Sequence, residues 1–305
     1  MKYVFLLLSL AAVQSSRGQT DTLYYDPPSG NYIVRYIGVT LDDRDTLITF
    51  TYEPPTKIDP IIECFVTAAA DGKYLYRYKI TNGPQAQQNL NEFSLHCDST
   101  VSVESRTPET SWRNRGRRMR DYSDPQNPKT VFTWVWRGDQ GLEAGWTIDS
   151  CILVSDGLPS LANSYSQAVR HILVWPADQK DNTSINIEAR LGRVEAYPNA
   201  NVYRKTIGPM LPATPFVRAS FLDTLISYKH QALALGWIDD AGVANSLDQK
   251  LDNARKQLVQ GNNKAAKNTL EAFVNEVEAQ KGKHLSSEAY ALLKYNAEYL
   301  IQRLQ

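Results

Sequence analysis

Basic residues are concentrated in one short segment of the sequence, residues 112–120. Planar guanidinium groups bind carboxylates, sulfates and phosphates through paired hydrogen bonds. The segment therefore predicts a site for a sulfated or uronic glycan, a phosphate or another extracellular polyanion. A run of charges is more often the solvated face of a loop, and that alternative stays open. The candidate binding residues are Trp112, Arg113, Arg115, Arg117, Arg118 and Arg120.

Residues that could perform catalysis or hold a metal are few and poorly spaced. No two of the four histidines stand at metal-ligand spacing, and no C-x-x-C pair occurs. Nucleophile-elbow, dinucleotide-binding and phosphate-loop patterns are absent from the sequence. His96 precedes Cys97, but neighbouring residues of a strand point to opposite faces, so they are not expected to act as base and nucleophile. We therefore predict no catalytic residue, no metal site and no cofactor.

The three cysteines are Cys64, Cys97 and Cys151. In an oxidising compartment two of them can pair, and we expect a disulfide between Cys64 and Cys97. The alternative is that all three are small buried side chains.

The N-terminus has the pattern of an export signal. Lys2 is followed by an apolar run to Val13, and Ser16 and Gly18 are small residues at the positions that a signal peptidase reads. We expect cleavage after residue 18, which gives a protein that is secreted, periplasmic or held at the cell surface. The chain has equal numbers of basic and acidic residues, which disfavours nucleic acid as a partner. No apolar run is long enough to span a membrane.

Short apolar segments separated by turn residues recur between residues 31 and 191, after a lead-in at 19–30 that we expect to be flexible. About ten strands at this spacing, without intervening helices, indicate an all-β domain, an immunoglobulin-like antiparallel β-sandwich over residues 19–205. The clearest strand places four apolar residues on one face: Tyr74, Tyr76, Tyr78 and Ile80.

Aromatic side chains on another predicted strand have two interpretations. Phe132, Trp134 and Trp136 share one face of it. Such rings could stack on a sugar, but large aromatics more often belong to the core, and we favour the core.

After a Pro-rich segment at 206–217, which we interpret as a linker, the periodicity becomes helical. Four amphipathic segments predict a small all-α helical bundle over residues 218–305. Asp239 or Asp240, Asn263 and Ser286 are expected to cap the second, third and fourth helices. We expect this module to fold alone.

The helical part resembles the FIMAH-type module, which accompanies adhesin-like and polysaccharide-degrading domains in secreted bacterial proteins. This resemblance implies a bacterial source and an accessory role. The preceding part resembles uncharacterised sandwich domains of secreted bacterial proteins, through residues 76–83 and 154–159. The motifs that carry the FIMAH resemblance lie at residues 235–238, 247–254, 261–266, 270–277 and 282–285.

These observations favour a non-catalytic extracellular protein that binds a glycan or another polyanion or takes part in surface interactions. Two alternatives stay open. Carboxylates that pair only in space could make the chain a polysaccharide-acting hydrolase or lyase, with the helical module as an accessory domain. The chain could also be a structural component of an envelope or matrix. The sequence does not define the oligomeric state.

Overall fold

The computed structural model describes residues 22–39, 45–69, 71–98, 101–106, 117–121, 129–136, 141–168, 171–172 and 201–304. The chain forms two compact units. One comprises residues 1–55 and 170–200, and the other residues 56–169 and 201–305. The single sandwich domain that we expected over residues 19–205 is therefore divided, and the sandwich shares its unit with the helices.

The first unit contains one antiparallel sheet, with the strand order β1-β2-β3-β12. Residues 22–30 are not the flexible lead-in that we predicted, because they form β1 and the turn into β2. Gly30 closes this turn with a φ of 67°, and its N–H donates to the Asp26 carbonyl at 2.8 Å. The strands are β1 (Thr22–Asp26), β2 (Asn31–Val39), β3 (Asp45–Glu53) and β12 (His171–Ile172).

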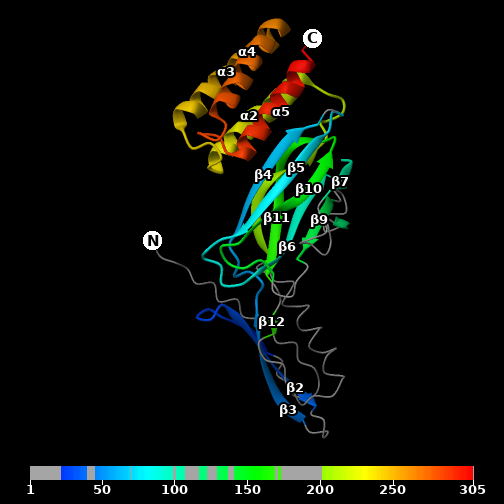
Figure 1. Ribbon diagram of the computed structural model, residues 1–305, viewed down its shortest axis with the longest axis vertical. Helices are drawn as coiled ribbons and strands as arrows, with labels where there is room; N and C mark the ends of the chain where they lie inside the picture. The colour runs from blue at the N-terminus through cyan, green and yellow to red at the C-terminus, as the bar shows by residue number, and fades with distance from the viewer. Residues whose placement is uncertain are drawn as a thin grey trace. The chain divides into compact units, whose positions relative to one another are not determined.

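The second unit contains two antiparallel sheets (Figure 1), which confirms the β-sandwich followed by helices that the sequence predicts. One sheet has the order β4-β5-β10-β7: β4 (Pro60–Ala68), β5 (Tyr74–Asn82), β10 (Thr147–Ser155) and β7 (Val103–Ser105). The other has the order β13-β11-β6-β9-β8: β13 (Val202–Met210), β11 (Leu158–Ala168), β6 (Leu90–Asp98), β9 (Lys129–Val135) and β8 (Arg117–Asp121).

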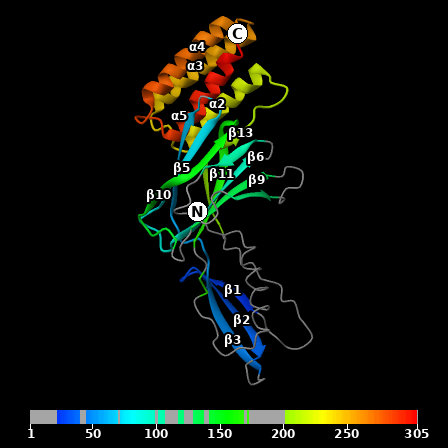
Figure 2. The ribbon, with the colours of Figure 1, turned by 45° about the vertical axis from the view of Figure 1, so that its right-hand side comes forward.

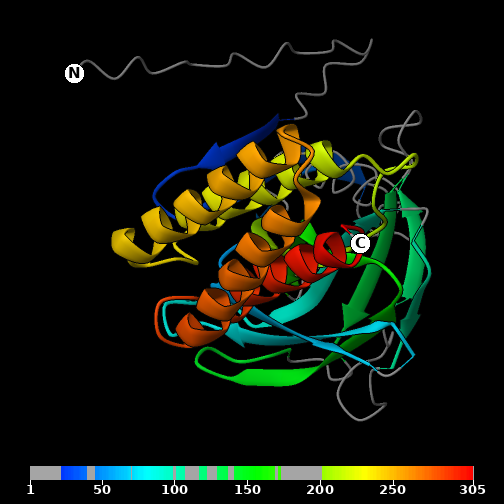
Figure 3. The same cartoon turned by 90° about the horizontal axis from the view of Figure 1, so that it is seen from above.

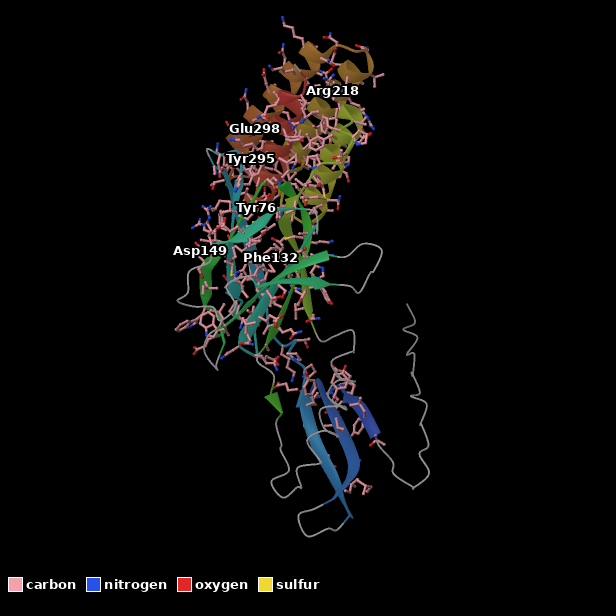
Figure 4. All side chains as sticks on the ribbon, turned by 90° about the vertical axis from the view of Figure 1, so that its right-hand side faces the viewer. Tyr76, Phe132, Asp149, Arg218, Tyr295 and Glu298 are labelled. Carbon is pink, nitrogen blue, oxygen red and sulfur yellow. The ribbon has the colours of Figure 1, made fainter. Side chains whose placement is uncertain are left out.

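The sandwich core is built on the aromatic residues that the alternating pattern predicts. Tyr76, Tyr78 and Ile80 of β5 are fully buried, as is Trp134 of β9. The Phe93 and Trp134 rings stack with their centroids 5.3 Å apart. Figure 4 labels Tyr76 among these side chains. Because Trp134 has no exposed surface, the ring belongs to the core and cannot stack on a sugar.

The Pro-rich segment begins later than predicted, because residues 206–210 belong to β13 rather than to a linker. Thr206 and Ile207 are buried, and Pro209 pairs with Pro159 of β11. β13 ends the strand order of its sheet, and proline is tolerated in such an edge strand because no ladder partner is lost on the open side. The proline content of this segment therefore led to the prediction of a linker where its first residues form a strand.

The four predicted helices are present and are best seen from above (Figure 3). Asp240 and Ser286 cap α3 and α5 as predicted, accepting from Val243 N at 2.7 Å and Ala289 N at 3.3 Å. The cap of α4 is Asn262, one residue before the predicted Asn263, because its Oδ1 reaches Ala265 N at 3.1 Å. The helices are α2 (Arg218–Ala234), α3 (Ala241–Val259), α4 (Asn263–Gln280) and α5 (Ser287–Gln302).

The helices lie at one end of the sandwich (Figure 2), and the two parts share a hydrophobic core. Most of the bundle packs around its own cluster, which includes Leu247, Leu251 and Phe273. On the side facing the sandwich, however, Leu292 of α5 and Tyr228 of α2 are buried in the same cluster as Tyr76. None of the helices described here is long and apolar enough to cross a membrane.

Candidate functional site

The predicted polyanion site is only partly visible in the structure. Trp112, Arg113 and Arg115 lie outside the described residues. Residues 117–121 form β8, at the end of the five-stranded sheet, with Arg118 paired with Phe132 of β9. Three of the five arginines, Arg117, Arg118 and Arg120, thus belong to a strand rather than to a loop.

The cysteines are thiols, without the disulfide that we expected between Cys64 and Cys97. All three are buried. Burial and the nearby Glu288 carboxylate raise the pKa of the Cys64 thiol well above its ordinary value, and burial does the same for Cys151. Because the thiolate is the reactive form of cysteine, the raised pKa values make Cys64 and Cys151 less reactive than an exposed thiol.

Two of the described histidines lie beside aspartates of the helical bundle. His230 Nε2 lies 3.1 Å from Asp248, and His284 Nδ1 lies 2.8 Å from Asp239. Within the described residues, no three His, Cys, Asp or Glu side chains gather in a group that could hold a metal ion.

Helix α5 covers the open edge of strand β4. Cys64 N–H donates to Glu288 Oε1 at 2.5 Å, and the Tyr295 hydroxyl donates to the Val66 carbonyl at 3.1 Å. Residues 64 and 66 are two apart in the strand, so their backbone polar groups point to the same side, away from β5. The helix thus supplies hydrogen-bond partners for backbone groups at this sheet edge, which would otherwise be free to pair with another strand. Figure 4 labels Tyr295 on this helix.

This junction joins the two parts through buried polar contacts as well as through the core. Glu288 is 4% exposed and Asn296 3% exposed. The Asn296 amide nitrogen donates to the Pro159 carbonyl of β11 at 2.8 Å. Helix α5 therefore makes hydrogen bonds to both sheets of the sandwich.

A hollow of about 650 Å³ opens where the segment before α2 meets the ends of the helices. Its cationic side chains are Arg218, at the start of α2, and Arg303, just after α5. Phe216, Val217 and Leu258 contribute apolar surface. Figure 4 labels Arg218 on the helical part.

The guanidinium of Arg303 is held in place by aromatic rings. It lies 3.3 Å from the centroid of the Tyr299 ring and 5.4 Å from that of Phe216. Its Nη1 donates to the Tyr299 carbonyl at 3.1 Å. Stacking of this kind fixes the guanidinium plane and leaves the remaining N–H groups at its edge for a ligand.

Neither arginine of the hollow has an acidic partner in the part of the chain that the structure describes. Among the ion pairs of the described residues, none within 4.0 Å involves Arg218 or Arg303. Arg255, on the same bundle, differs because its Nη2 lies 2.5 Å from Asp223. The hollow therefore carries two positive charges that no acidic side chain of the described residues neutralises within 4.0 Å.

Sequence reasoning missed this hollow, because the residues that form it are about 85 positions apart along the chain. One local signal was available. Tyr299 and Arg303 are four residues apart, the spacing at which helical side chains stack. That spacing indicates a stacked arginine, but it does not predict that Arg218 lies close to Arg303.

Comparison with known proteins supports the assignment of the helices. Curated proteins give no match to this sequence. One solved structure, an uncharacterized protein from Nocardia farcinica with an immunoglobulin-like fold, is 10% identical, with a TM-score of 0.28 over 49% of this chain and 97% of that chain. Residues 223–302 match the FIMAH domain family, which confirms the predicted resemblance of the helical module.

Proposed function

We propose that the protein is exported from a bacterial cell and acts as a non-catalytic binding protein for an acidic extracellular glycan. The export pattern of residues 1–18 supports a location outside the cytoplasm. The match of residues 223–302 to the FIMAH family supports an accessory role, since such modules accompany adhesin-like and polysaccharide-degrading domains.

One observation carries the proposal, the pair of unneutralised arginines in the hollow beside α2 and α5. A uronic or sulfated sugar presents carboxylate or sulfate oxygens, which guanidinium groups bind with paired hydrogen bonds. Phe216 supplies an apolar ring against which the C–H face of a sugar can pack. Because Arg303 is already stacked on Tyr299, little side-chain entropy is lost when it binds.

The electrostatics of the hollow add to this preference. Helix α2 begins here, and its N-cap residue Val217 makes no side-chain capping bond. The partial positive charge of the helix N-terminus therefore adds to the charges of Arg218 and Arg303. A neutral sugar gains little from such an arrangement, so we expect selectivity for acidic glycans over neutral ones.

The test is binding of a heparin-derived octasaccharide by isothermal titration calorimetry, with a neutral dextran oligosaccharide as the comparison ligand. Replacing both Arg218 and Arg303 with Ala should reduce affinity for the octasaccharide about tenfold or more. Binding to the parent protein should weaken as salt rises, because exposed charges are screened. The matched control is Arg255→Ala, which removes one charge of the same bundle but already has an acidic partner.

Three further outcomes bear on the proposal. Equal affinity of the parent and the double variant would refute the hollow as the binding site. If affinity is instead lost when Arg115, Arg117 and Arg118 are replaced with Ala, the arginine-rich segment is the site. Release of reducing ends from a polysaccharide by the pure protein would overturn the non-catalytic assignment and favour the enzyme alternative.

A further inference from the structure

A separate cavity of about 260 Å³ lies where the strands β11 and β13 meet the segment before α2 and the helices α2 and α5. Its walls are mostly apolar and include Leu158, Met210 and Phe221. Prolines from β11 and from the Pro-rich segment add flat ring surfaces. Of the described residues that line this cavity, none carries a charge at neutral pH.

Two largely buried residues of the cavity wall each carry a polar atom that has no hydrogen-bond partner among the described residues. Asn296 uses its amide nitrogen twice, donating to the Pro159 carbonyl at 2.8 Å and the Leu292 carbonyl at 2.7 Å, but its Oδ1 accepts no hydrogen bond. The hydroxyl of Tyr228, a residue only 7% exposed, likewise has no partner. Burial alone raises the pKa of Tyr228 to about 12.

Two other polar side chains of the cavity wall are different, because they are satisfied within the protein. The Ser160 hydroxyl donates to the Gly208 carbonyl at 3.0 Å, and the Thr224 hydroxyl donates to the Ser220 carbonyl at 3.0 Å. Asn296 Oδ1 and the Tyr228 hydroxyl therefore give this largely apolar cavity an acceptor and a hydroxyl that a ligand could pair with in place of water.

We propose that this cavity binds a small, uncharged, ring-bearing molecule that carries a hydroxyl group. The hydroxyl donates to Asn296 Oδ1 and accepts from Tyr228, while the ring packs against the proline and phenylalanine rings. A charged ligand is excluded, because the cavity offers no opposite charge and burial of an unpaired charge is costly. A purely apolar ligand fits the walls but leaves both polar groups unpaired.

This cavity is distinct from the cationic hollow, although Phe216 and Val217 contribute to both. The two sites take opposite chemistry: acidic ligands in the hollow and neutral ligands in the cavity. The inference therefore does not rest on the proposed glycan binding, and either can fail without the other.

The experiment uses the full chain and three probes of similar size: phenol, toluene and benzoate. Ligand-observed NMR titration measures the dissociation constant of each. We expect phenol to bind about fivefold to thirtyfold more tightly than toluene, since its hydroxyl makes two hydrogen bonds, and benzoate to show no binding. Tyr228→Phe removes one of these two hydrogen bonds, so it should reduce the advantage of phenol to about twofold to fivefold while leaving toluene unchanged.

A pair of matched substitutions on α2 locates the binding. Ser220→Trp places a bulky ring at the cavity wall from an exposed position and should abolish phenol binding. Ser227→Trp makes the same change at an exposed position of the same helix that does not line the cavity, and should leave binding intact. Failure of phenol to bind, equal binding of phenol and toluene, or unchanged binding in Ser220→Trp would overturn the proposal.

Discussion

Replacing Glu288 with Ala should destabilise the protein by separating helix α5 from strand β4. In the native protein the Glu288 carboxylate is 4% exposed and accepts the Cys64 N–H at 2.5 Å. The Ser287 hydroxyl donates to the other carboxylate oxygen at 3.1 Å. Because β4 ends the strand order of its sheet, no strand can take over the Cys64 N–H when the carboxylate is removed.

The magnitude follows from three contributions. A lost hydrogen bond to a charged group is worth about 1.5–3 kcal/mol, and the lost methylene about 0.8 kcal/mol. Removing a buried charge recovers part of its desolvation cost, which lowers the sum. We therefore expect Glu288→Ala to lower the free energy of unfolding by about 2–3 kcal/mol. Glu288→Gln keeps an acceptor at the same place and should cost about 1 kcal/mol, because neutral hydrogen bonds are about half as strong.

The assay is urea unfolding of the full chain, followed by far-ultraviolet circular dichroism and by tryptophan fluorescence. The control is Glu278→Ala, which removes an exposed carboxylate that pairs with Lys294 at 2.6 Å and should cost less than about 1 kcal/mol. Two results would refute the reasoning. One is a Glu288→Ala variant no less stable than the control, and the other is a Gln variant as unstable as the Ala variant.

Three further predictions test other parts of the structure. Burial raises the pKa of Tyr228 to about 12, whereas the unfolded tyrosine loses its proton near pH 10. The free energy of unfolding therefore falls as the pH rises from about 10 to about 12. In urea titrations at pH 11, the Tyr228→Phe variant should lose about 1 kcal/mol less of its free energy of unfolding than the parent protein does. Gly157→Ala would place a Cβ 2.7 Å from Met210 N, and thermal melts should show a loss of about 1–3 kcal/mol. Native protein should not react with a thiol reagent, and unfolded protein should expose three thiols, from Cys64, Cys97 and Cys151.

Elements with local signals could be predicted from the sequence. The alternation around Tyr76 and Tyr78 identified a strand whose apolar face is buried. The capping residues Asp240 and Ser286 were identified because a cap and its N–H partner lie three residues apart. In both cases the information is contained in a few neighbouring positions.

Elements that depend on distant partners could not be predicted in this way. The sequence around Pro209 predicts a linker unless it is known that this segment forms a strand at a sheet edge. The burial of Glu288 depends on a strand 224 residues away in the sequence. The same holds for the two candidate sites: Arg218 and Arg303 meet only when the bundle closes, and Tyr228 faces the same cavity as Asn296 only when α2 and α5 pack side by side.

The covering of β4 by α5 has a consequence for the order of events during synthesis. Cys64 leaves the ribosome 224 residues before Glu288. At a rate of about 5–20 residues per second, the strand waits about 10–45 seconds for the helix that covers its edge. Throughout this interval the nascent chain exposes the backbone groups of residues 64 and 66 to any strand that it meets, including the same strand of a neighbouring nascent chain. The edge of β4 therefore needs protection from other strands until α5 docks on it, whether the chain folds during synthesis or after export.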